Sequence, residues 1–191
     1  MSSDLDASVG DEPEPWTRFD HPMPVAFDYV IQWCTAVQMQ ADRVLSTLGG
    51  IARGSEAALL IVALNNAERA ARFASANASG EAATSAIDNA LKQFDDAVPD
   101  VKAARNMIEH FDAYERGTGD SQQPGINRRT RKPDKAATDT FSVAYVGRDP
   151  NLLEIGPHRI NVTGARDGAS ELLERVHQAL KGVEKIHASG T

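Results

Sequence analysis

The sequence of 191 residues lacks what several protein classes require. Its one cysteine, Cys34, excludes an internal disulfide and a zinc site built from several thiolates, and it favours a reducing compartment. The longest apolar run, 57–64, is far shorter than the roughly 20 residues that cross a bilayer. The first ten residues are acidic and lack the basic-then-apolar pattern of a secretion signal. We therefore expect a cytoplasmic protein with no membrane association.

Positive charge is also scarce. Lys and Arg number 20 against 27 Asp and Glu, which gives a net charge of −7, and aromatic residues make up 6%. Such a chain does not coat nucleic acid nonspecifically, because neutralising phosphates requires clustered Lys and Arg. The charge is unevenly distributed, however: residues 1–20 carry six acidic side chains and one basic, whereas residues 116–135 carry six basic and two acidic. Any nucleic-acid site must therefore be local.

Apolar residues recur at steps of three and four along the first part of the chain, which is the pattern of amphipathic helices. Four segments show it: 24–48, 56–75 (preceded by Ser55), 81–98 and 101–116. Asp100 is expected to cap the fourth helix, and Gly117 and Gly119 to end it. Apolar residues from Val101 to Phe111 are expected to form a bundle seam. Four helices with short connections predict an antiparallel four-helix bundle over 23–117.

The pattern changes on both sides of this bundle. Residues 1–22 predict an acidic flexible tail, and 118–139 a basic polar linker without an apolar period. Apolar residues then alternate from Thr140, and two short strands flank the turn at 156–158. A last helix follows, with its cap predicted at Asp167 or Ser170. The expected fold class is mainly α, a four-helix bundle followed over 140–191 by a small β-meander and a C-terminal helix.

The fourth predicted helix carries Arg105, Asn106 and His110. An Arg followed by a polar residue, with a His after four intervening residues, resembles the motif of the HEPN superfamily. The resemblance covers residues 24–117 at most and implies a HEPN-like bundle. One subgroup of the family carries Tyr two residues after the His, where this chain has Asp112 and places Tyr114 further on.

The resemblance also implies an activity and partners. These are metal-independent cleavage of RNA without a cofactor, and a homodimer whose two fourth helices face each other across a composite cleft. A role in a toxin or defence system is implied as well, with a cognate regulatory protein as a further partner.

The residue types of the motif suit RNA cleavage on chemical grounds. RNA carries its own nucleophile, the 2′-hydroxyl, so a base and an acid suffice, and histidine is the residue type best suited to transfer protons near neutral pH. The guanidinium of Arg105 matches a phosphate and can stabilise charge on the phosphoryl oxygens. Asn106, one helical turn before His110, can orient that side chain or a phosphate oxygen. Arg105 lies roughly 140° around the helix from His110, so one helix does not aim both groups at one point.

A basic segment follows the motif helix and can follow an RNA backbone without reading bases. Its substrate-binding candidates are Arg116, Arg128, Arg129, Arg131 and Lys132. A flexible solubilising linker has the same composition, and this alternative stays open.

A different class of function is also compatible with the sequence. Arg105 and Glu109 form an i, i+4 pair, as do Asp112 and Arg116, and such charged stripes are usually a solvated helix face. The chain can then be a non-catalytic dimeric interaction module of unknown partner, with the β-meander recruiting that partner through a strand edge. No metal site is expected, since the remaining histidines lack ligand spacing.

Overall fold

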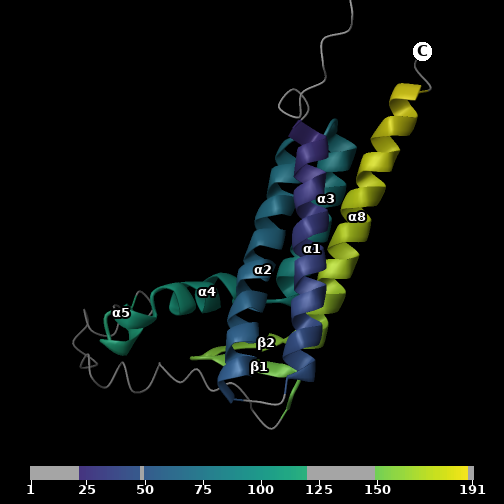
Figure 1. The fold of residues 1–191 in the computed structure, drawn as a ribbon. Helices are drawn as coiled ribbons and strands as arrows, with labels where there is room; N and C mark the ends of the chain where they lie inside the picture. The colour runs from purple at the N-terminus through teal and green to yellow at the C-terminus, as the bar shows by residue number, and fades with distance from the viewer. Residues whose placement is uncertain (1–21, 48–49, 120–148, 189–191) are drawn as a thin grey trace, which may run out of the picture.

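The computed structural model describes residues 22–47, 50–119 and 149–188, and their side chains over 23–47, 50–119 and 149–179. Within these ranges the chain is mainly helical, with six helices and a two-stranded antiparallel sheet (Figure 1). The predicted predominance of helix is confirmed. The predicted alternating strand after Thr140, the acidic tail up to residue 21 and all but two residues of the basic linker lie outside the described residues.

Four long helices run side by side: α1 (Pro22–Ser46), α2 (Gly50–Ala76), α3 (Glu81–Ala97) and α8 (Val162–Ala188). Helix α1 packs against α2 and α8, and α3 packs against α8 and α2. The four-helix bundle predicted over 23–117 is not confirmed, because the C-terminal helix, and not the segment after Asp100, lies alongside α1 and α3. Helix α2 also begins at Gly50, earlier than the predicted start after Ser55.

Helix α8 is suited to this place by its long apolar stripe. The buried members of the stripe are Val162, Ala165, Ala169, Leu172 and Val176. Gly168 permits a close approach to α3, because a Cβ there would lie 3.3 Å from Cβ of Ala97. The stripe and α1–α4 contribute to one hydrophobic cluster, so the C-terminal segment shares its core with the N-terminal helices.

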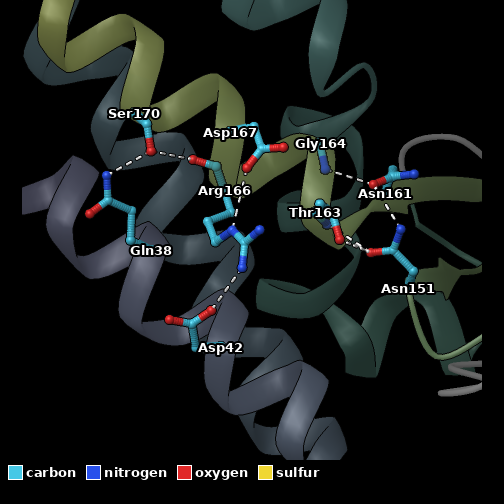
Figure 2. A network of polar contacts seen from close by, with 9 residues as sticks. All are labelled: Gln38, Asp42, Asn151, Asn161, Thr163, Gly164, Arg166, Asp167 and Ser170. Carbon is cyan, nitrogen blue, oxygen red and sulfur yellow. Dashed lines mark hydrogen bonds and ion pairs between the residues drawn. The ribbon is translucent and has the colours of Figure 1, made fainter.

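The first turn of α8 is held by two asparagines (Figure 2). Oδ1 of Asn161 accepts the N–H of Gly164 at 2.7 Å, and Oδ1 of Asn151 accepts the N–H of Thr163 at 2.8 Å. The carbonyl of Asn151 accepts the N–H of Val162. The prediction that Asp167 or Ser170 caps this helix is therefore wrong. The helix starts earlier because Asn161 supplies the N-cap acceptor that its free N–H groups need.

Polar contacts also join α8 to α1. Nε2 of Gln38 donates to Oγ of Ser170 at 2.9 Å, and Arg166 pairs with Asp42 at 3.2 Å (Figure 2). Both pairs lie at the exposed border of the α1–α8 contact. They fix the register in which the two apolar stripes meet.

A short hairpin precedes α8. Strands β1 (Leu152–Ile155) and β2 (His158–Asn161) are antiparallel, with Leu153 opposite Ile160. Gly156 has φ of 57° in the turn, a conformation that favours glycine. The predicted turn between two short strands is confirmed. The apolar face of the hairpin joins the helical core.

The segment predicted as one helix over 101–116 is two helices, α4 (Val101–Glu109) and α5 (Phe111–Glu115), with a break at His110. Val101, Ala104 and Met107 are buried, and α4 packs against α2. Phe111 is 57% exposed, so its predicted place on the bundle seam is wrong. Both short helices project sideways from the long ones (Figure 1).

Candidate functional site

Two polar contacts anchor the start of α4. Nζ of Lys102 lies 2.8 Å from Oε1 of Glu68 on α2, and Nδ1 of His158 on β2 lies 3.4 Å from Oδ2 of Asp100. Asp100 occupies the N-cap position with φ of 68°, but its side chain makes no capping hydrogen bond. Asp100 therefore occupies the predicted N-cap position, but its carboxylate does not accept a hydrogen bond from the helix as a capping side chain would. Its carboxylate instead ties the motif helix to the hairpin.

Arg105 lies on α4 and is paired within its own helix. Its Nε donates to Oε1 of Glu109 at 2.8 Å, and its Nη2 lies 2.7 Å from Oε2. The side chains are 37% and 39% exposed. The predicted i, i+4 pair is thus present, and the guanidinium of Arg105 is partly exposed to solvent.

His110 is the residue at which the motif helix breaks. Its φ and ψ are −115° and 34°, so it ends α4 and begins α5. Its N–H donates to the carbonyl of Asn106 at 3.0 Å, and its carbonyl accepts the N–H groups of Ala113 and Tyr114 at 3.0 and 3.2 Å. The backbone is therefore held on both sides. The side chain is exposed, and within the described ranges no hydrogen bond joins it to Arg105.

Asn106 contacts a residue that sequence reasoning gave no role. Its Nδ2 donates a hydrogen bond of 3.2 Å to Oη of Tyr114 on α5. Tyr114 is 2% exposed. An unbroken helix would place the two Cα atoms about 12 Å apart along its axis. The break at His110 reorients α5 so that the two side chains meet.

The end of α5 fixes the ring of Tyr114. Gly117 has φ of 72°, its N–H donates to the carbonyl of Tyr114, and the N–H of Thr118 donates to the carbonyl of Ala113. These two bonds form the Schellman motif, which confirms the predicted glycine stop. The reversed chain places Gly119 against the ring, where a Cβ would lie 2.4 Å from Cδ1 of Tyr114.

Of the five basic residues predicted to bind substrate, the structure describes one. Arg116 is exposed directly after α5 and pairs with Asp112. The other four, Arg128, Arg129, Arg131 and Lys132, lie outside the described residues. The structure thus brings Asn106 and His110 together with Tyr114, and leaves Arg105 and Arg116 in local ion pairs.

A cavity of about 310 Å³ lies beside the start of α4, lined by Glu68, Asp95 and Lys102 together with apolar residues at the end of α3, in the turn that follows it and in the first turn of α4. Burial alone would raise the pKa of Glu68, but hydrogen bonds and positive charge from Lys102 and Arg72 outweigh it and hold that pKa below its usual value. Burial, and then the charge of Glu68, raise the pKa of Asp95. The network holds α4 against α2 and α3.

Other site classes find little support in the described part of the chain. It contains no group of three or more His, Cys, Asp or Glu side chains arranged to hold a metal ion. None of its helices combines the length and apolar character needed to cross a membrane. Burial raises the pKa of the Cys34 thiol to about 12, which makes it a poor nucleophile.

Comparison of the chain with models of known protein families, with curated proteins and with solved structures finds no match. What the chain does is therefore inferred from the residues of α4 and α5 themselves.

Proposed function

We propose that the chain is a HEPN-like, metal-independent endoribonuclease. His110 transfers protons, Arg105 stabilises the phosphoryl charge, and Asn106 holds the motif in place. The observation that carries the proposal is that the imidazole of His110 and the guanidinium of Arg105 both reach solvent on a helix that projects from the helical layer. Sequestered side chains at these positions would have excluded a substrate.

The reaction that these groups suit is internal transesterification of RNA. A base takes the proton of the 2′-hydroxyl, the 2′-oxygen attacks phosphorus, and the bond from phosphorus to the 5′-oxygen breaks. An acid protonates that oxygen, which leaves a 2′,3′-cyclic phosphate and a 5′-hydroxyl. One imidazole cannot be acid and base in the same step, so the proposal includes a C2 homodimer in which each copy supplies one His110.

The position of Arg105 supports the dimer as well. Helical spacing places Arg105 and His110 on different sides of the motif, and Arg105 is paired with Glu109. A second copy with its α4 facing the first brings one copy's Arg105 toward the other's His110. A toxin or defence role and a cognate regulatory protein belong to the same proposal, on the strength of the resemblance alone.

The test is cleavage of a single-stranded RNA by the full chain in EDTA. We expect His110→Ala to abolish cleavage, and Arg105→Ala to lower kcat by about 100-fold, the scale of losing one stabilising group at a transition state. Matched controls are His177→Ala, an exposed histidine on α8, and Arg175→Ala, which removes an i, i+4 pair with Glu171. Unchanged cleavage by His110→Ala overturns the assignment.

The alternative function is a non-catalytic dimeric interaction module. The observation that favours it is the two-point pairing of Arg105 with Glu109, which is how a solvated helix face satisfies its charges. This alternative predicts a dimer in solution that leaves RNA intact. The same assay, run beside a measurement of molecular mass, separates the two functions.

A further inference from the structure

Tyr114 is the buried polar residue closest to the motif in the sequence. Its ring is 2% exposed, yet its hydroxyl reaches the side chain of Asn106. A buried tyrosine hydroxyl needs a hydrogen-bond partner, since losing its water without one is unfavourable. The contact also orients Asn106, because the amide nitrogen must face Tyr114.

Three hydrogen bonds close a ring through the motif. The side chains of Asn106 and Tyr114 are joined at 3.2 Å, the carbonyl of Asn106 accepts the N–H of His110, and the carbonyl of His110 accepts the N–H of Tyr114. Each residue of the ring therefore contacts the other two. A change at any one of them alters the geometry at the break.

Packing against Gly119 also holds the side chain of Tyr114 in its place in this hydrogen-bonded cycle. Gly119 lies so close to the aromatic ring that a side chain would collide with it. The left-handed Gly117 sets the turn that brings Gly119 there. Tyr114 is thus locked in one position, and it passes this constraint to Asn106 and His110.

We infer that Tyr114 is a positioning residue. It holds the side chain of Asn106 and the backbone of His110 in the geometry for RNA cleavage, and this role rests on the proposed function. A catalytic group displaced by about 1 Å can lose as much as 100-fold in rate. Tyr114 itself touches no substrate, and it acts through the hydrogen bond to Asn106.

The test uses the full chain with Tyr114→Phe, Asn106→Ala and the double variant, and a single-stranded RNA in EDTA. Phe keeps the ring against Gly119 and removes the hydroxyl. We expect kcat to fall about tenfold in Tyr114→Phe with KM within about twofold, because a positioning bond is lost and substrate contacts are not. The double variant should resemble Asn106→Ala within about twofold, since both changes remove the same bond. The control is Tyr29→Phe, an exposed tyrosine on α1.

Two further readouts separate positioning from folding. The imidazole resonances of His110, assigned with His110→Ala, should shift in Tyr114→Phe and stay in place in Tyr29→Phe. Gly119→Ala, which displaces the ring and leaves the hydroxyl, should also lower kcat. A fall in kcat that follows a lower melting temperature, with unmoved His110 resonances, overturns the inference.

The outcomes also distinguish this inference from the function on which it rests. Wild-type cleavage with unchanged kcat in Tyr114→Phe overturns the role of Tyr114 and leaves the endoribonuclease standing. Absence of cleavage by the wild type overturns the endoribonuclease, and the role of Tyr114 in the reaction with it.

Discussion

Glu109 holds the guanidinium of Arg105 with both of its carboxylate oxygens, at 2.8 and 2.7 Å, one turn further along α4. If Arg105 binds an RNA phosphate, as the proposed function requires, that phosphate must displace this carboxylate. Under the proposal, Glu109 therefore competes with the substrate for Arg105.

Removal of that competitor should strengthen RNA binding. Glu109→Gln keeps the size of the side chain and removes its charge, so we expect KM for RNA to fall about threefold, the scale of an exposed ion pair. Steady-state kinetics measures the change. The matched control is Glu171→Gln, which releases Arg175 on α8 and should leave KM unchanged. An unchanged KM in Glu109→Gln would show that Arg105 does not bind the substrate.

Acid should destabilise the fold partly through Glu68. Its pKa lies below the usual 4.5, so its ion pairs contribute stability that is fully present above that value and lost as pH falls through the folded-state pKa. Glu68→Gln should lower the free energy of unfolding by about 1–3 kcal/mol at neutral pH, and its difference from wild type should shrink as pH falls through the folded-state pKa of Glu68. Urea denaturation across this range measures both.

The pKa of Asp95 is shifted in the opposite direction to that of Glu68, so its effect on stability has the opposite dependence on pH. Its raised pKa means that ionisation is less favourable in the folded protein than in the unfolded chain. The favourable contribution of its protonated form is present below the unfolded pKa and is lost as pH rises through the folded one. Asp95→Asn should therefore be at least as stable as wild type at neutral pH. A loss as large as that of Glu68→Gln would contradict the network as described.

The asparagines before α8 should differ in their contribution to stability. Asn161→Ala removes one acceptor for a helix N–H and should lower the free energy of unfolding by about 1 kcal/mol. Asn151→Ala should lower it further, since the Asn151 side chain also accepts from Oγ1 of Thr163. Thermal denaturation compares them with Asn89→Ala, an exposed position on α3. Equal stabilities of all three variants would contradict this assignment of the cap.

The sequence alone predicted the helices and turns better than it predicted which helices pack together. Apolar periods gave the helical segments, and Gly117 and Gly156 marked real turns. Periodicity shows which face of a helix is apolar and not which helix covers it, so the packing of α8 against α1 and α3 was missed. That packing depends on small residues such as Gly168, whose effect appears only with α3 beside it.

In the candidate site, too, one contact was predictable from the sequence and another was not. The Arg105–Glu109 pair follows from helical spacing and is present. The break at His110 has no proline or glycine to mark it, and the apolar spacing continues through it to Phe111. The contact between Asn106 and Tyr114 exists because of that break, so a reader of the sequence who assumes one helix cannot find it.

The most direct test of the account is an end-group measurement. RNA is incubated with the wild-type chain and with His110→Ala, both in EDTA, and the termini of any fragments are determined. The account predicts 2′,3′-cyclic phosphate and 5′-hydroxyl ends from the wild type and no fragments from the variant. Equal amounts of product from both proteins, or fragments with 5′-phosphate ends, would contradict it.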